Sequence, residues 1–210
     1  MIITIDGLSG TGKSWLAWQL AQHFGYHYLG SGYIYRLYAY DPDTISKLLH
    51  RSRSPHDICT FSFDGDVLAH YDGHDVTAAL TSPEIAQRAS QLAAKPEVRA
   101  LLKSWQLSYD RAPGLVADGR DMGTVIFPHA QKKIYLTASC HVRAERRLMQ
   151  LKNNGIHASL EEIIDQIKQR DDRDTSRSIS PLKPAEQALH VDVSQLNRQE
   201  MLDTCLSLVQ

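Results

Sequence analysis

The chain has 210 residues, of which 42% are hydrophobic and 22% are charged, and its formal net charge is −1. This length and composition predict one globular domain with a well-filled core and with room for inserted segments. The balanced charge excludes a general attraction to nucleic acid or to an anionic membrane, so any anionic ligand must be bound by a local cluster of cations.

The N-terminal sequence MIITIDG has no basic segment and no long apolar run of the kind found in signal peptides. No stretch of the sequence approaches the length of a membrane span. Cys59, Cys140 and Cys205 are odd in number and far apart, which disfavours a disulfide framework or a structural zinc site. We therefore expect a cytoplasmic protein that has no membrane anchor and binds no nucleic acid.

The first predicted strand, residues 2–5, is an isoleucine-rich run that stops at the pair Asp6-Gly7. Apolar residues then recur at helical spacing from Leu16 to Phe24, and Gly25 ends that helix. The segment that joins them is therefore a glycine-rich loop that leads from a buried strand into a helix.

Four further short apolar strands follow along the chain, and a helical segment follows each of them. The last of these helices begins at Asn197, and Glu200 lies at the spacing of a capping box. Five short strands that alternate with helices predict an α/β fold, namely a five-stranded parallel sheet covered by helices on both faces. The four later strands are expected at residues 26–29, 114–119, 132–138 and 188–192.

One stretch that departs from this alternation lies in the middle of the chain. Residues 60–77 alternate apolar and polar side chains around Asp64-Gly65 and Asp72-Gly73, a pattern typical of small antiparallel hairpins. Two helices follow, one opened by Ser82 and the other by Lys95, and each has proline at its first position. This stretch predicts a small α+β insertion in the parallel-sheet core.

A second departure is a helix that Ser159 and Glu162 begin with capping-box spacing and that runs into RDDRDTSR, residues 170–177. Six of these eight residues are charged, and a charge run of this kind is usually a solvated helix face. The alternative is a clamp for an anion, with Asp171 and Asp172 turned away from it. Helical spacing places four charged residues on the clamp's face: Arg170, Arg173, Asp174 and Arg177.

The loop GLSGTGKS, residues 7–14, fits the pattern G-x-x-x-x-G-K-[ST] and stands between a strand and a helix, as that motif requires. Glycines allow backbone N–H groups to surround phosphate oxygens, and the helix N-terminus adds its positive dipole end. Lysine then reaches the β- and γ-phosphates, and the serine hydroxyl faces Mg²⁺. The predicted nucleotide-binding residues are Gly7, Ser9, Gly10, Thr11, Gly12, Lys13 and Ser14.

Four further segments follow this loop: LGSGYIYR (29–36), ASQLAAKPEVR (89–99), ADGRDMGTVIFP (117–128) and QRDDRDTSRSISPL (169–182). Together with the loop, they make nearly the whole chain resemble the bacterial cytidylate kinases, a family of nucleoside monophosphate kinases. The resemblance implies ATP as phosphoryl donor, Mg²⁺ as cofactor, and CMP or dCMP as acceptor, bound by a monomer.

The resemblance also implies three parts within a single nucleoside monophosphate kinase domain. A core of about residues 1–35, 111–151 and 178–210 binds ATP, an insertion of about residues 36–110 binds the monophosphate, and a helical lid of about residues 152–177 closes over both. The anion that residues 170–177 would bind is then the phosphate of a substrate.

Carried over residue by residue, the resemblance implies three sets of site residues besides the loop. The acceptor phosphate and sugar are bound by Ser31, Arg36, Arg120, Arg170, Asp174 and Arg177. Cytosine is bound by Ser90, Arg99 and Asp121. The implied catalytic residues are Lys13, Arg120, Arg170 and Arg177.

Several of these assignments have alternatives. A fixed carboxylate such as Asp121 accepts a hydrogen bond from the amino group of cytosine and repels the carbonyl of uracil, but it could equally be a salt bridge to Arg99 or Arg120. Arg36 would otherwise be read as a solvated helix residue. Asp118, at the end of a predicted strand, is with equal weight a second Mg²⁺ ligand beside Ser14 or a structural carboxylate.

The sequence departs from the family pattern at Gly30, where the family usually carries an acid, and at Leu8, where proline is common. Rival functions are a kinase for another monophosphate, a kinase for a small hydroxylated metabolite, and a non-catalytic nucleotide-binding regulator. A hydroxyl acceptor must lose a proton and calls for a carboxylate base, whereas the oxygen of CMP is already anionic. The many arginines favour the phosphate acceptor.

Overall fold

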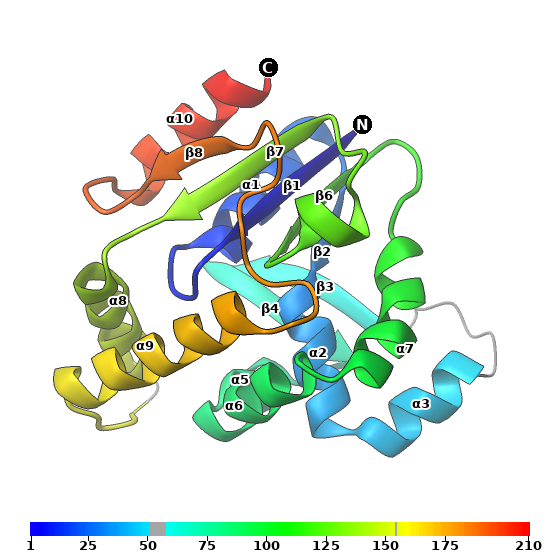
Figure 1. Cartoon of the computed structure of the whole chain (residues 1–210), viewed down its shortest axis with the longest axis horizontal. Helices are drawn as coiled ribbons and strands as arrows, with labels where there is room; N and C mark the ends of the chain where they lie inside the picture. Colours follow the sequence, from blue (N-terminus) through cyan, green and yellow to red (C-terminus); the bar gives the residue numbers. More distant parts are fainter. Residues whose placement is uncertain (51–57, 154) are drawn as a thin grey trace.

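The computed structural model describes residues 1–50, 58–153 and 155–210 (Figure 1). Its main sheet has five strands in the order β2-β6-β1-β7-β8, and every neighbouring pair runs parallel. The predicted α/β fold is therefore confirmed, with strand ends shifted by at most two residues. The strands are β1 (Ile2–Gly7), β2 (His27–Gly30), β6 (Leu115–Gly119), β7 (Lys132–Thr137) and β8 (Leu189–Asp192).

The two central strands, β1 and β6, are buried at every residue because both faces of the sheet are covered. Gly7 ends β1 opposite Leu136 of β7. A Cβ at Gly7 would lie 2.1 Å from the Leu136 carbonyl oxygen, and φ at Gly7 is +148°. Only glycine therefore allows the chain to leave the sheet at this point and to form the loop.

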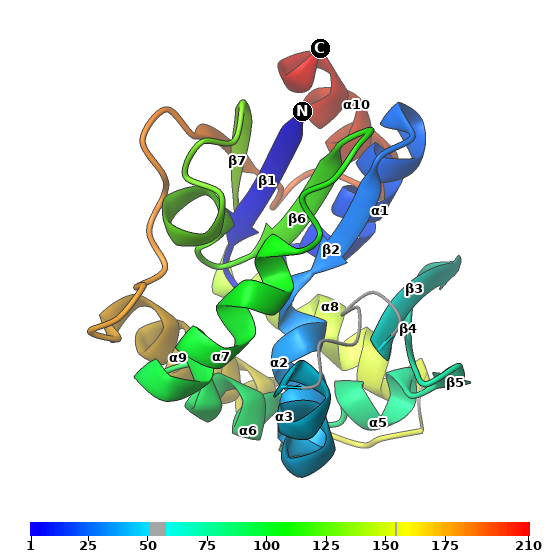
Figure 2. The same cartoon turned by 90° about the vertical axis from the view of Figure 1, so that its right-hand side faces the viewer.

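The two faces of the sheet are covered differently (Figure 2). Helices α1 (Lys13–Phe24) and α10 (Arg198–Val209) pack together on one face. The other face carries η1 (Met122–Ile126), a single π-helical turn, and α7 (Pro96–Leu107) packs against that turn. The helix expected after the third strand is thus only one wide turn.

The predicted capping boxes are both present. Ser159 and Glu162 exchange side-chain and backbone hydrogen bonds at the start of α9 (Leu160–Ser176), and Asn197 and Glu200 do the same at the start of α10. Among the described residues, no helix combines the length and the apolar character needed to cross a bilayer.

The insertion has a second, antiparallel sheet of β3 (Cys59–Asp64), β4 (Asp66–Tyr71) and β5 (His74–Asp75), which confirms the predicted hairpins. The β3–β4 hairpin rests on the core, because Phe63 stacks on Trp18 of α1 with ring centroids 5.9 Å apart. The described helices of this region are α2 (Ser31–Tyr40), α3 (Pro42–His50), α5 (Thr77–Thr81), α6 (Pro83–Leu92) and α7 (Pro96–Leu107).

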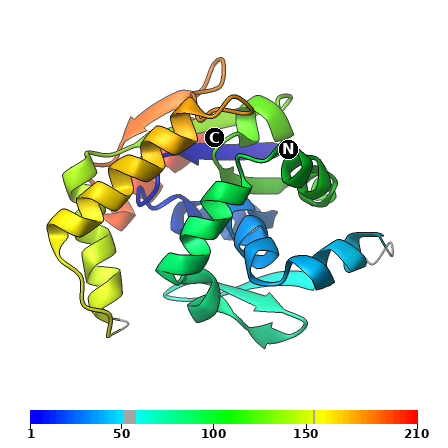
Figure 3. The same cartoon turned by 60° about the horizontal axis from the view of Figure 1, so that its bottom comes forward.

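Helices α8 (Cys140–Asn153) and α9 form a helical hairpin with a small apolar cluster of its own, separate from the main core. Figure 3 shows α9 running beside the insertion, and α9 contacts α6. The helix ends at Ser176, and Arg177 already has extended backbone angles. The spacing predicted that Arg177 shares a helical face with Arg170 and Asp174. This prediction is wrong, because Arg177 lies beyond the end of the helix.

Substitution Ile163→Ala removes a fully buried side chain from the small cluster of the α8–α9 hairpin. We expect the opening free energy of α8 and α9 amides to fall by about 2–5 kcal/mol, with much smaller changes in β1. Native-state hydrogen exchange measures both, and Ile5→Ala in the main core is the matched control. Equal acceleration of exchange in β1 and α9 would show that the hairpin has no separate stability.

Candidate active site

The loop of residues 7–14 follows β1 and opens α1, as the motif predicts. Gly12 adopts a left-handed conformation directly before the helix, and no side chain caps the first turn. The first backbone N–H groups of α1 therefore point to a position that an anion can occupy. Lys13 Nζ donates to the Leu8 carbonyl at 2.5 Å and to Thr11 Oγ1 at 3.2 Å, so its ammonium lies over the loop.

Lys13 is one of several buried cations at this end of the sheet. Burial lowers the pKa of Lys13 well below its usual value, and the positive charges of Arg120 and Arg170 lower it further. The carboxylate of Asp118 opposes this shift. The ammonium is therefore held in a place where an added negative charge would favour its protonated form.

Asp118 stands at the end of β6, next to β1, and it meets Ser14 of the loop. Ser14 Oγ donates to Asp118 Oδ2 at 3.1 Å, and the hydroxyl of Tyr28 donates to Asp118 Oδ1 at 2.8 Å. Ser14 and Asp118, proposed as a pair from the sequence, are thus brought together. Tyr28 was not foreseen.

A second carboxylate joins the core to α9. Arg120, directly after β6, donates from Nε to Asp174 Oδ2 at 2.9 Å, and Arg170 Nε lies 3.8 Å from the same oxygen. Burial alone would raise the pKa of Asp174, but the two arginines hold it below its usual value. The charge run of residues 170–177 is therefore not a solvated surface, since Asp174 is buried and bound to the core.

Two more arginines, Arg36 of α2 and Arg147 of α8, face this cluster from other elements. Burial lowers the pKa of Arg170 to about 9, and the positive charges of Arg120, Arg36 and Arg147 contribute. Arg147 comes from α8, and repulsion from Arg36 of α2 likewise lowers its pKa in addition to burial. Cations from α1, α2, α8, α9 and the turn after β6 therefore converge on one region.

Asp121 lies in a neighbouring buried cluster with Arg99 and Arg177. Arg99 of α7 donates from Nη2 to Asp121 Oδ2, and Arg177 Nη2 lies 3.8 Å from the other oxygen. Burial raises the pKa of Asp121 and the two arginines oppose that shift. The salt bridge to Arg99 considered above does exist, and the Arg177 Nη2 group has no hydrogen-bond partner.

The remaining predicted site residues lie on the insertion side. Ser31, the first residue of α2, donates to Gln106 Oε1 at 2.8 Å, and the buried hydroxyl of Ser90 on α6 has no partner. The Arg36 guanidinium lies 5.6 Å from the Tyr33 ring centroid, and burial lowers its pKa. The interpretation of Arg36 as a solvated helix residue is therefore wrong.

Arg143 of α8 is a further residue that the sequence analysis missed. It is 3% exposed, and it donates from Nη1 to the Ser9 carbonyl at 3.1 Å and from Nε to the Ala138 carbonyl at 3.0 Å. Its Nη2 lies 2.7 Å from Asp171 Oδ2. Asp171 thus turns away from the other arginines as expected. It does not face solvent, because it forms an ion pair with Arg143, which also contacts the loop of residues 7–14.

Asp6, directly before the loop, was also missed. Its carboxylate accepts from the backbone N–H groups of Met122 at 2.9 Å and of Gly123 at 2.8 Å. These residues follow Arg120 and Asp121, so Asp6 ties the turn that carries both of them to β1. Arg143, Arg147 and Asp6 do not belong to any sequence motif that predicts their contacts. The three arginines of the segment RAERR in α8 were the available signal, as a local excess of positive charge.

The order of the sheet, the loop between β1 and α1, and the cationic region at the carboxyl ends of the strands define a P-loop protein of the kinase type. The family model "Cytidylate kinase" matches residues 3–210. The cytidylate kinases of Shewanella denitrificans and Stutzerimonas stutzeri are 42% and 43% identical to this chain, over 100% and 99% of it and 96% and 94% of their own lengths.

A solved structure from Thermus thermophilus shares the fold at 20% identity, with a TM-score of 0.50 over 100% of this chain and 95% of its own. The likeness in fold and the two full-length relatives agree with the site geometry. The chain belongs to the cytidylate kinase family.

The tie made by Asp6 predicts a pH dependence of stability. Burial raises the pKa of Asp6 from 3.8 to about 7, although the hydrogen bonds from Gly123 and Met122 act in the opposite direction. The folded protein therefore binds a proton that the unfolded chain has released, and stability decreases as pH rises through this window, by up to about 1.4 kcal/mol per pH unit.

Asp6→Asn cannot titrate at this position. We expect the difference in unfolding free energy, wild type minus variant, to fall between pH 4 and pH 7 in urea titrations and then to level off. A difference that stays constant from pH 4 to pH 8 contradicts this assignment.

Proposed function

We propose that this protein transfers the γ-phosphate of ATP to CMP or dCMP and releases ADP and the diphosphate. The observation that carries this proposal is a group of cations that converge on one region: Lys13, Arg36, Arg120, Arg147 and Arg170. Burial lowers the pKa of four of them, and the positive charges of other members of the group lower it further: Lys13, Arg36, Arg147 and Arg170. Two polyanionic substrates that meet there would neutralise this charge. A neutral hydroxyl acceptor would not.

The donor half of the site is the loop of residues 7–14. Its backbone N–H groups and Lys13 would bind the β- and γ-phosphates, and Ser14 and Asp118 would hold Mg²⁺ together with phosphate oxygens and water. The described residues contain no group of three or more His, Cys, Asp or Glu that could hold a metal by itself, which fits an ion held mainly by the nucleotide. Mg²⁺ would neutralise charge on the phosphates.

The acceptor half uses the arginines around Asp174. Arg36, Arg120, Arg170 and Arg177 would bind the acceptor phosphate, because planar guanidinium groups grip phosphate oxygens with two parallel hydrogen bonds. Asp174 and Ser31 would lie beside the phosphate and the sugar of the acceptor nucleotide. Arg147 would add a further cation from α8.

The cytosine ring would be bound by Ser90, Arg99 and Asp121. Asp121 would accept a hydrogen bond from the exocyclic amino group, and the unpartnered Ser90 hydroxyl would find its partner on the base. Arg99 holds the Asp121 carboxylate in place, so the salt bridge and the base-reading role are compatible.

We infer a division of the chain into three working parts. The parallel-sheet core, about residues 1–35, 111–151 and 178–210, would bind ATP; the insertion, about 36–110, would bind the monophosphate; and about residues 152–177 would form a lid. Asp174 of α9 is already bonded to Arg120 of the core, and Arg170 lies beside Asp174. Further closure of this helix would align the two phosphates and exclude water. We also propose that the protein works as a cytoplasmic monomer.

A coupled ADP-release assay with ATP·Mg²⁺ and each of CMP, dCMP, UMP, AMP, GMP, dTMP and shikimate tests the proposed function. Turnover with CMP and dCMP at rates well above all other acceptors supports it. Preference for another monophosphate or for shikimate supports one of the rival kinases. ATP binding without turnover on any acceptor would establish the non-catalytic regulator.

Asp121→Asn offers an amide that presents either a donor or an acceptor to a pyrimidine. We expect the ratio of kcat/KM for CMP over UMP to fall about tenfold or more, as for the loss of one specific base contact. Asp165→Asn, an exposed residue of α9, is the matched control and should leave the ratio unchanged. If both rates of Asp121→Asn fall by one common factor, Asp121 is structural and does not read the base.

A further inference from the structure

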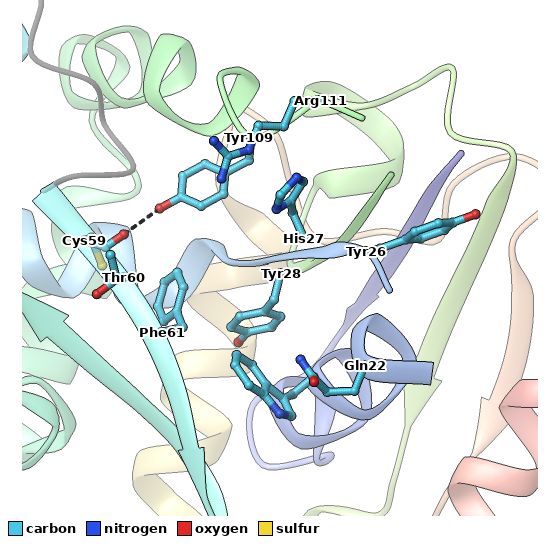
Figure 4. Close-up of a pocket in the computed structure, with 10 residues that line it drawn as sticks. Gln22, Tyr26, His27, Tyr28, Cys59, Thr60, Phe61, Tyr109 and Arg111 are labelled. Atoms are coloured by element: carbon cyan, nitrogen blue, oxygen red, sulfur yellow. Dashed lines mark hydrogen bonds between the residues drawn. The ribbon is translucent and has the colours of Figure 1, made fainter. Parts of the chain in front are cut away.

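A pocket of about 230 Å³ lies between α1, β2 and β3, and Tyr109 and Arg111 also line it (Figure 4). Tyr28 forms part of its wall. The Tyr28 ring makes edge contacts with Phe61, at 5.0 Å between centroids, and with Trp18, at 5.5 Å. Two aromatic neighbours therefore fix the plane and the direction of this ring.

The other end of Tyr28 reaches the proposed metal site. Its hydroxyl donates to Asp118 Oδ1 at 2.8 Å, while Ser14 Oγ donates to Asp118 Oδ2 at 3.1 Å. Asp118 is 5% exposed and Tyr28 is 7% exposed. The torsion that turns a carboxylate is broad and has no strong preference of its own. The fixed Tyr28 hydroxyl therefore sets the orientation in which Asp118 Oδ2 faces Ser14.

Gly30 leaves the space that this hydroxyl occupies. Residues two apart on a strand point to the same side, so Gly30 and Tyr28 are neighbours on β2. A Cβ at Gly30 would lie 2.6 Å from the Tyr28 hydroxyl oxygen and 2.9 Å from Cδ2 of Tyr33. Any side chain at position 30, including an acid, would displace the Tyr28 hydroxyl from Asp118.

We propose that Tyr28 is a positioning residue that holds the Asp118 carboxylate ready for the divalent cation, and that Gly30 is required because its missing side chain admits the Tyr28 hydroxyl. This inference rests on the proposed function, in which Ser14 and Asp118 hold Mg²⁺. Groups that orient a metal's ligands typically change metal affinity or activity by about 10–100-fold when they are removed.

The test is Tyr28→Phe, which removes the hydroxyl and keeps the ring. Mn²⁺ binding to the complex of the protein with a non-hydrolysable ATP analogue is measured by electron paramagnetic resonance. We expect Mn²⁺ affinity to fall about tenfold, with the calorimetric affinity for CMP in the absence of metal unchanged. Tyr26→Phe, whose ring lines the same pocket, is the matched control and should keep wild-type Mn²⁺ affinity.

Gly30→Ala is the second variant and keeps Tyr28 itself. We expect Gly30→Ala to weaken Mn²⁺ binding as Tyr28→Phe does. If Tyr28→Phe does not fold, Gly30→Ala still tests the proposal. Asp118→Asn separates the two levels of the argument. If it weakens Mn²⁺ binding while Tyr28→Phe and Gly30→Ala bind as wild type does, the role of Tyr28 is refuted and the metal site stands. If Asp118→Asn itself binds Mn²⁺ normally, both the metal site and the role of Tyr28 are refuted.

Discussion

Repulsion among buried and partly buried cations is the constraint on which the rest of this structure depends. Burial and the positive charges of Arg120 and Arg170 lower the pKa of Lys13. Burial and the positive charges of Arg120, Arg36 and Arg147 lower the pKa of Arg170. Folding brings these groups from five elements to the carboxyl ends of the parallel strands, where burial deprives them of water. The free protein thus carries a local excess of positive charge that a pair of nucleotides can neutralise. Binding energy and catalysis have the same origin in this arrangement.

A few carboxylates keep this arrangement in place without neutralising it. Asp174 connects the core to α9 through Arg120, and Asp6 connects β1 to the turn after Arg120. Asp171 connects α9 to Arg143, which in turn donates to the nucleotide loop. Each of these bonds joins elements that are far apart in sequence. The fold therefore holds the proposed phosphate-binding groups of the core at fixed positions relative to one another before substrates bind.

Local signals in the sequence were sufficient for the framework and for the loop. The capping residues Ser159 and Asn197 start their helices as predicted, because a cap depends only on residues three positions apart. Contacts between distant elements could not be predicted in this way. The bonds of Tyr28 to Asp118 and of Arg143 to Ser9 depend on how β2 and α8 pack, which no short motif specifies. The prediction that Arg177 lies on the face of the helix was also wrong, since helical spacing does not show that the helix stops at Ser176.

The most direct measurement for the central claim compares the stability and the activity of Arg170→Gln with those of the wild type. Arg170 Nε is buried without a hydrogen bond, so repulsion should outweigh its pairing with Asp174. Urea unfolding without nucleotides should show the variant to be as stable as the wild type or more stable, while kcat/KM for CMP falls at least about tenfold. A variant that is clearly less stable without nucleotides but retains wild-type kcat/KM would contradict the account, because Arg170 would then serve the fold and not the substrates.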